Sequence, residues 1–447
     1  MEHNDRQQRM RQWMEQYYML NRVPVSEEMG RFTRSLAQQL GAKLHTIPSG
    51  TECLSWIIPD KWTVKEAYIE TLDGHRIADF HWHPLYLQAY SASFSGIVPR
   101  EQLLQHISVH PHSDDKLIYE SRWQYRPGPK TEWGFSLTRN TVNDLSEEEY
   151  RVHIDVEFSK GTLDIVDWTL PGATSDTVLL AAHTCHPGQV NDGIACIAVL
   201  VELFRSLQRQ TNRHFTYRLI LGPEYFAAAG LLHYGTGIEQ IRYAVYLDMP
   251  GHNQPLSFSR SFSGNSYIDA ATRNVLKSYE PGYSEAPYRG LYGNDEMFYD
   301  GPDFEIPTVG ISRYDYEHYH TDEDNLEHCD FAKLEQTVVR LQQIIDVLET
   351  DCIPTRHYKG PLQLSRYHLY IDPKQNPKGY QSLQAAQILM DGQRSCLELA
   401  EALDIDYRFV RSFADQLQTQ GLASIRPAVS PVRVLTREDG ARQETIR

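Results

Sequence analysis

The sequence lacks the features that mark membrane and secreted proteins. It has no apolar run of about 18 residues, which is the length that a membrane-spanning helix needs. Its first six residues are polar or charged apart from Met1, so a secretory signal peptide is not expected. We therefore expect no membrane association and a cytoplasmic location.

Cysteine is scarce, and basic residues are fewer than acidic ones. The six cysteines lie far apart in a chain of 447 residues and form no C-x-x-C pair. This spacing argues against a disulfide scaffold and against a zinc site built from thiolates, and it fits a reducing compartment. The formal net charge is −16. Because phosphate binding needs clustered Lys and Arg, we do not expect nucleic acid as a partner.

Hydrophobic periodicity divides the chain into regions, as expected for a chain too long for one core. Helical spacing of apolar residues predicts helices at 6–20 and 27–40. Short alternating runs, such as 86–90, predict an inserted β-rich domain over 61–161. Alternating strand and helix patterns over 162–350, completed by residues 1–60, predict an α/β domain with a mainly parallel sheet covered by helices.

The last part of the chain, 360–447, has the outline of a winged helix-turn-helix. Its expected recognition helix carries only the arginines Arg408 and Arg411, whereas a DNA reader shows a basic face. Docking or dimerisation is therefore favoured over DNA binding, and a homo-oligomer is the favoured assembly. The expected elements are a linker at 354–373, helices at 382–390, 395–403 and 406–419, and a hairpin of 421–425 with 431–435.

The most informative motif is H-T-C-H-P-G-Q-V-N-D-G, which begins at His183 and contains Asp192. The apolar run 177–182 before it predicts a buried strand that ends at His183. The carboxyl edge of an open sheet is where α/β folds place their chemistry. Imidazole and carboxylate are also the ligands of hydrolytic zinc. A lone histidine at a strand end is more often structural, so the interpretation needs further candidates.

Three later strand ends supply those candidates. Glu224 and Asp248 each follow an apolar run, and His320 follows another in the segment H-Y-H-T-D. Acids gathered at one edge repel each other unless a cation binds. Glu224 could instead stabilise the start of a helix through the helix dipole, by about 0.3–1 kcal/mol. His318, two residues before His320, could support His320 or replace it as a ligand.

With these motifs, residues 1–60 and 162–350 resemble the zinc exopeptidase fold shared by leucine-type aminopeptidases and glutaminyl cyclases. That pattern runs His-x-Asp, Asn-Asp-x-x-Gly, Glu-Glu, Asp-Met-x-Gly and a late His-Thr. The whole chain is more closely similar to a family of bacterial aminopeptidase-like proteins with a β-rich insert and a C-terminal winged helix. The similarity rests on Trp62 to Ile69, Trp133-Gly-Phe, His183-Thr-Cys-His-Pro, Asn191-Asp192, Pro223-Glu224, Asn294-Asp-Glu296 and Tyr319-His320-Thr-Asp-x-Asp-Asn.

The resemblance implies a set of metal ligands. His183, Asp192 and Asp248 would hold one zinc ion, and Asp192 would bridge to a second zinc ion held by His320. Glu224 would be the general base that takes a proton from metal-activated water. The implied function is that of a zinc-dependent aminopeptidase or a related amide hydrolase, acting on a small peptide or amide.

Further polar residues are expected around the same cleft. Asp295, Glu296 and Tyr319 are candidates for substrate binding, and a solvated acidic loop is the alternative for the two acids. His186 and Arg313 are candidates for lining the cleft.

The chain departs from the pattern of the resemblance at two positions. Cys185 stands where an Asp would orient the first histidine, and we expect it to be a buried neutral thiol. Tyr225 replaces the second Glu, normally a zinc ligand, so one zinc ion is an alternative to two. The same fold also leaves open a small-molecule amide deacylase, a cyclotransferase, or a catalytically decayed binding or regulatory protein.

Overall fold

The computed structural model describes residues 2–122 and 128–428. An eight-stranded mixed sheet forms the centre of this part of the chain, in the order β1-β10-β12-β11-β13-β16-β14-β15. The four strands β12, β11, β13 and β16 run parallel to one another, and antiparallel strands flank them on both sides. The strands are β1 (Lys43–Pro48), β10 (Thr162–Leu170), β11 (Thr177–His183), β12 (Thr216–Gly222), β13 (Ile241–Leu247), β14 (Ser257–Ser259), β15 (Ser284–Ala286) and β16 (Thr308–Ser312).

Helices cover both faces of this sheet, as the pattern of β11 requires. Every residue of β11 is buried, and alternate side chains join two different hydrophobic clusters. Val178 and Leu180 pack with the helices of one face, whereas Leu179 packs with those of the other. The first face carries α1 (Glu2–Tyr17), α2 (Glu27–Leu40), α5 (Ala195–Arg209), α7 (Tyr267–Tyr279) and α9 (Phe331–Thr350), and the second carries α6 (Phe226–Tyr234) and α8 (Glu296–Tyr299).

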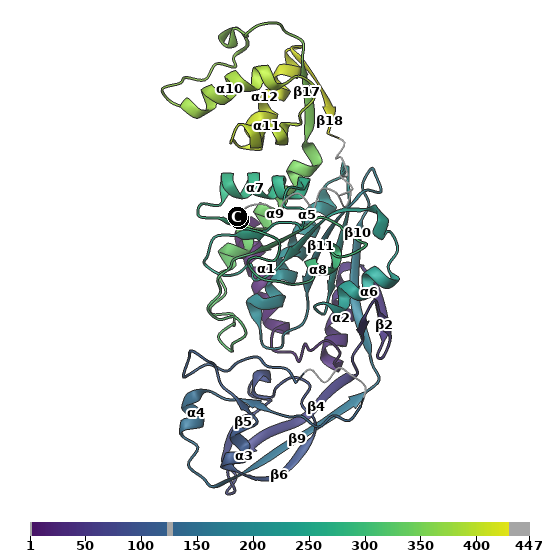
Figure 1. The fold of residues 1–447 in the computed structure, drawn as a ribbon, viewed down its shortest axis with the longest axis vertical. Helices are drawn as coiled ribbons and strands as arrows, with labels where there is room; N and C mark the ends of the chain where they lie inside the picture. Colours follow the sequence, from purple (N-terminus) through teal and green to yellow (C-terminus); the bar gives the residue numbers. More distant parts are fainter. Residues whose placement is uncertain (1, 123–127, 429–447) are drawn as a thin grey trace, which may run out of the picture.

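The predicted fold class, a mainly parallel sheet covered by helices, is thus confirmed for the central strands. Figure 1 shows this sheet in the middle of the molecule, with a smaller sheet at one end and the last three labelled helices at the other. Within the described ranges, no helix has both the length and the apolar character needed to cross a membrane.

The smaller sheet lies within the region predicted to be a β-rich insert. Its order is β5-β4-β9-β6, and all its pairs are antiparallel. The strand predicted at 86–90 is wrong: Pro84 begins a short 3₁₀ turn, and only isolated bridges follow at Leu87 and Ala89. The elements of this region are β4 (Lys61–Glu70), β5 (Arg76–Asp79), β6 (Phe94–Pro99), α3 (Arg100–Leu104), β7 (Ile107–Ser108), β8 (Phe135–Ser136), α4 (Arg139–Asn143) and β9 (Glu149–Ser159), and a short hairpin of β2 (Glu52–Cys53) and β3 (Trp56–Ile57) precedes them.

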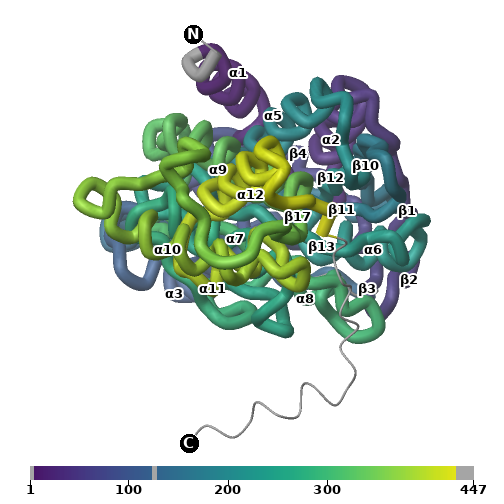
Figure 2. Tube along the Cα trace, turned by 90° about the horizontal axis from the view of Figure 1, so that it is seen from above, coloured from purple at the N-terminus to yellow at the C-terminus, as the bar shows by residue number. Residues whose placement is uncertain are grey.

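The C-terminal region contains α10 (Pro377–Leu389), α11 (Cys396–Ala402), α12 (Tyr407–Thr419) and β18 (Ala423–Pro427). The expected linker is wrong at its start, because β17 (Cys352–Arg356) forms a strand there and pairs antiparallel with β18. The expected partner strand at 431–435 lies outside the described residues, so the winged helix stays a prediction. Figures 1 and 2 together show these helices on one side of α7, where the Tyr407 backbone N–H donates to Asn274 Oδ1 at 2.8 Å.

Candidate metal centre

Four parallel strands deliver the predicted site residues to one edge of the sheet. His183 ends β11, Glu224 stands two residues after the end of β12, and Asp248 follows β13 directly. His320 lies in the loop after β16. Because these strands are parallel neighbours, their carboxyl ends meet, as predicted from the sequence.

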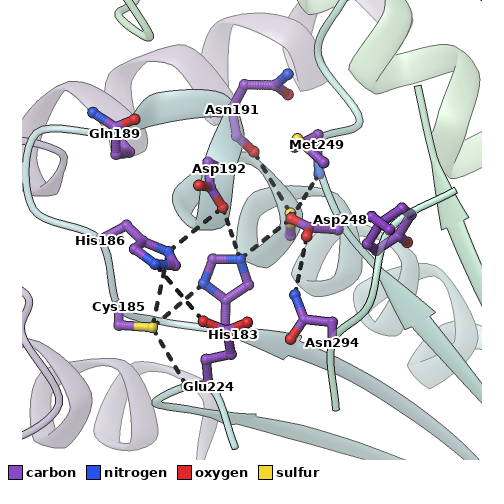
Figure 3. Close-up of polar contacts among 12 residues, drawn as sticks. His183, Cys185, His186, Gln189, Asn191, Asp192, Glu224, Asp248, Met249 and Asn294 are labelled. Carbon is purple, nitrogen blue, oxygen red and sulfur yellow. Dashed lines mark hydrogen bonds and ion pairs between the residues drawn. The ribbon is translucent and has the colours of Figure 1, made fainter. Parts of the chain in front are cut away.

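A first group of donor atoms surrounds His183, which is fully buried (Figure 3). Its Nε2 lies 3.1 Å from Asp192 Oδ1 and 3.2 Å from Asp248 Oδ1. The second oxygen of Asp248 accepts a hydrogen bond from Asn294 Nδ2 at 3.1 Å, which orients the carboxylate. The three residues His183, Asp192 and Asp248 place one donor atom each within 4.8 Å of the others.

A second group of donor atoms shares Asp192. His320 Nε2 lies 3.0 Å from Asp192 Oδ2, and His186 Nδ1 lies 3.5 Å from Asp192 Oδ1. Both Asp192 Oδ2 and His320 Nε2 are buried and have no hydrogen-bond partner among the described residues. Buried polar atoms that lack a hydrogen bond are costly, and a cation bound by both atoms would remove that cost. Nitrogen and carboxylate donors in this number suit zinc.

Backbone contacts fix Asp192 in place. The backbone N–H groups of Asn191 and Asp192 donate to the two oxygens of Asp324 at 2.7 and 2.9 Å. Gly193 follows with φ of 113°, and a Cβ there would meet the Cys185 carbonyl oxygen at 2.9 Å. A side chain at position 193 would therefore push the loop away from His183.

Arg22 binds the loop that follows β11, and it was not identified from the sequence. This guanidinium is fully buried and donates to the carbonyl oxygens of Thr184, His186 and Gln189 at 3.0, 2.8 and 2.7 Å. It satisfies carbonyl groups that a tight buried loop would otherwise leave unpaired. No local signal marks Arg22, because these three partners lie more than 160 residues away in the chain.

Glu224 lies beside the two donor groups. Its Oε2 is 3.7 Å from His186 Nε2 (Figure 3). Burial raises the pKa of Glu224 to about 7, against the opposing effect of His186. This carboxyl can therefore take up and release a proton near neutral pH.

Cys185 occupies the place of the carboxylate that would orient His183. Its Sγ lies 3.6 Å from His183 Nδ1, and the Glu224 backbone N–H donates to the same sulfur at 3.4 Å. The thiol is buried, as predicted. Burial raises its pKa, yet the neighbouring His186 and His183 outweigh burial and lower the pKa to about 5.

Tyr225, the second departure from the pattern, belongs to neither donor group. Its ring packs against Trp56 and Phe298, with ring centroids 5.4 and 6.2 Å away. Its backbone N–H donates to Asp295 Oδ1 at 2.6 Å. The aromatic ring thus belongs to an apolar cluster under α6, and it supplies no carboxylate for a second metal position.

The acids predicted to bind substrate are buried and already have partners. Asp295 accepts the Tyr225 N–H, and Glu296 accepts the Asn294 N–H and pairs with Arg289 at 3.1 Å. Burial raises the pKa of Asp295 well above its usual range. A substrate-binding role for these two acids stays a prediction.

Of the remaining predicted residues, one lies beside the donor atoms and two do not. Tyr319 stacks on His320, with ring centroids 3.8 Å apart, and so lies beside the second donor group. His318 pairs with Glu323 at 3.0 Å instead of joining the metal donors. Arg313 is fully buried and pairs with Glu280 at 3.0 Å, so it does not line the site.

Tyr119, from the β-rich insert, was not predicted at the site. Its ring centroid lies 5.0 Å from that of His186 and 5.2 Å from that of His320. Its backbone N–H donates to the His320 carbonyl oxygen at 2.7 Å. The insert therefore forms one wall of the site, which a sequence pattern of strands alone does not reveal.

Comparison with known proteins confirms the resemblance to aminopeptidase-like proteins. A crystal structure of a "putative peptidase" from Clostridium acetobutylicum has a TM-score of 0.84 at 21% identity, over 95% of this chain and 97% of that chain. A zinc aminopeptidase from Bacillus subtilis has a TM-score of 0.53 at 14% identity, over 76% of this chain and 94% of that chain. At these identities the likeness establishes the fold.

A relative and a family model cover most of the sequence. A Clostridium acetobutylicum protein named "Putative polysaccharide biosynthesis protein with aminopeptidase-like domain" is 23% identical over 403 residues, which span 86% of this chain and 88% of that protein. The model of the family described as Domain of unknown function (DUF4910) matches residues 11–351, and the chain therefore belongs to this family.

Proposed function

We propose that this protein is a zinc-dependent amide hydrolase of the aminopeptidase type, acting on a small peptide or amide. The observation that carries the proposal is the convergence of His183, Asp192 and Asp248, with His320 on the other oxygen of Asp192. Orphaned buried atoms at Asp192 and His320 support a cation between these side chains. The fold shared with a zinc aminopeptidase supports the same chemistry.

Each side chain has a role in this proposal. His183, Asp192, Asp248 and His320 hold zinc, which when bound would polarise the scissile carbonyl and make a water molecule more acidic. Glu224 is the general base, because its carboxylate lies beside the donor groups, with Oε2 3.7 Å from His186 Nε2 (Figure 3). It accepts a proton at its carboxylate and returns it to the leaving amine.

The substrate would lie between the sheet edge and the insert. Tyr319 and Tyr119 flank His320 and offer aromatic surfaces for a substrate side chain. Asp295 and Glu296 are the acids proposed to bind an amine-bearing substrate.

A second candidate function is the deacylation of a small biosynthetic amide, such as an acylated amino sugar. The name of the Clostridium relative, which refers to polysaccharide biosynthesis, favours it. Both candidates use the same metal and base and differ in the group that binds beside Tyr319.

Hydrolysis assays on zinc-loaded protein test the proposal. Aminoacyl p-nitroanilides and N-acetylated amino sugars would be compared for the unaltered protein, Glu224→Gln and the exposed control Glu239→Gln. We expect one substrate class to be hydrolysed, a loss of about 10²–10⁴-fold for Glu224→Gln, and full activity for the control. Equal rates for Glu224→Gln and the unaltered protein would contradict the proposed base, and no hydrolysis of either class would favour a binding protein.

A further inference from the structure

Tyr225 cannot supply the carboxylate that the sequence pattern places at a second metal position. The imidazole of His186 lies close enough to Asp192 to offer a donor atom instead. We propose that His186, Asp192 and His320 form a second zinc position, with the imidazole of His186 in place of that carboxylate. The inference rests on the proposed function, because both positions share Asp192. It makes the centre binuclear despite the change at position 225.

The geometry places three donor residues around one point. His186, Asp192 and His320 each offer an atom within 4.8 Å of the others. The ring centroids of His186 and His320 are 5.0 Å apart. Asp192 uses Oδ1 toward His183 and His186 and Oδ2 toward His320, so its carboxylate lies between the two groups.

Unsatisfied atoms point to an ion at this position. Asp192 is 1% exposed, and its Oδ2 has no hydrogen bond with the described residues. His320 Nε2, 3.0 Å away, is equally without a hydrogen bond. An imidazole nitrogen and a carboxylate oxygen that face each other without hydrogen-bond geometry are arranged as two ligands of one ion.

The loop fixes His186 in a conformation that serves this position. His186 has φ of 74°, in the left-handed region that side chains rarely adopt, and Arg22 donates to its carbonyl oxygen at 2.8 Å. The ring lies edge to face with that of Tyr119, at 87°, which limits its rotation. His186 is 8% exposed, so the surrounding protein determines its direction.

An alternative role for His186 is to orient Glu224. The His186 Nε2 to Glu224 Oε2 distance of 3.7 Å is too long for a hydrogen bond. Cys185 Sγ, at 3.9 Å from Nδ1, also makes only a distant contact. Among the residues that the structure describes, the ring therefore has no close polar contact apart from the shared carboxylate of Asp192.

Zinc titration of the metal-free full chain tests the inference. Bound zinc would be counted by calorimetry and by elemental analysis after equilibration with buffered zinc. We expect two zinc ions per chain for the unaltered protein and for the exposed control His214→Ala, and one for His186→Ala. His186→Glu, which restores a carboxylate, should bind two, and this variant guards against a general loss of folding in His186→Ala.

The outcomes separate this inference from the proposed function. One zinc ion on the unaltered protein, or two on His186→Ala, would overturn the second position and leave the hydrolase proposal standing. No bound zinc would overturn both. Two zinc ions that fall to one in His186→Ala, without hydrolysis of any amide, would support the position and count against the proposed function.

Discussion

Cys185 stands where the sequence pattern has an Asp, so a thiol takes the place of a carboxylate beside the proposed metal ligand His183. The sulfur stands where a carboxylate would accept the proton of His183 Nδ1, at a distance of 3.6 Å. A partner of this kind fixes which ring nitrogen is free to bind a metal. The sulfur lies close enough to Nδ1 to act as that acceptor.

Removing the Cys185 sulfur should therefore weaken zinc binding without abolishing it. We expect Cys185→Ala to lower zinc affinity about 10–100-fold, as for the loss of other partners of metal-bound histidines. Cys185→Asp should keep affinity close to that of the unaltered protein. Competition with a chelator of known affinity measures both, and equal affinity for the Ala variant would show that the sulfur does not orient His183.

The sequence predicted the residues that follow strands, because a buried apolar run ending in a polar side chain is a local pattern. His183, Glu224, Asp248 and His320 were found in this way. Arg22 and Tyr119 could not be found, since they reach the site across long sequence separations from a helix-flanking segment and from the insert. His186 was given only a lining role, because its importance depends on the direction in which a left-handed loop residue points.

At the scale of elements, β10 is tied to its neighbours by buried charges. Asp167 of β10 accepts hydrogen bonds from Arg218 of β12 at 2.7 and 3.0 Å, and it contacts His45 of β1 at 2.8 Å. Burial raises the pKa of Asp167, but His45 and Arg218 outweigh it and lower the pKa to about 2. The ion pair therefore links three strands on the antiparallel side of the sheet.

The Asp167–Arg218 ion pair predicts that the stability of the fold falls at low pH. A folded-state pKa of about 2, below the ordinary 3.8, contributes about 2 kcal/mol of unfolding free energy that is fully present above pH 4 and lost as the pH falls through 2. Asp167→Asn should cost about 3–5 kcal/mol at pH 7, because Arg218 stays buried without its partner. The cost should shrink toward pH 2.

Urea unfolding across this pH range measures the effect. The exposed ion pair of Asp155 with Lys65, at 3.6 Å, provides the control. Asp155→Asn should change the free energy of unfolding by less than about 1 kcal/mol at any pH. If Asp167→Asn lowered the free energy of unfolding equally at every pH, packing and not charge would hold β10 to its neighbouring strands.

The insert contributes an element of the site as well as its own sheet. Residues 117–119 run beside the loop that carries His320, through the Leu117 N–H to Asp322 Oδ1 at 2.9 Å and the Ile118 bridge to Thr321. These contacts place Tyr119 against both histidines of the second donor group. The insert should therefore shape substrate binding without holding metal.

Truncating Tyr119 separates these two roles. We expect Tyr119→Ala to lower kcat/KM by about 3–10-fold through a higher KM, since an aromatic contact contributes about 1 kcal/mol. Bound zinc should stay unchanged. Steady-state kinetics with elemental analysis checks both, beside the exposed Tyr234→Ala as control. Loss of zinc in Tyr119→Ala would instead give this residue a structural role at the metal.

At the scale of the whole molecule, the large sheet lies between the insert at one end and the C-terminal helices at the other (Figure 1). The C-terminal region contacts α7 through Arg273 with Glu401 at 3.1 Å and is therefore anchored to the helices of the first face. A homo-oligomer built through these end regions stays a prediction, which the molar mass from light scattering would test.

The central claim is that His183, Asp192 and Asp248 hold zinc at the carboxyl edge of the sheet. X-ray diffraction from crystals of zinc-loaded protein, recorded on both sides of the zinc absorption edge, locates the metal directly. The account predicts an anomalous peak within bonding distance of these three side chains, and a second peak between His186 and His320. A featureless map at the sheet edge, or a peak only at surface residues, would contradict it.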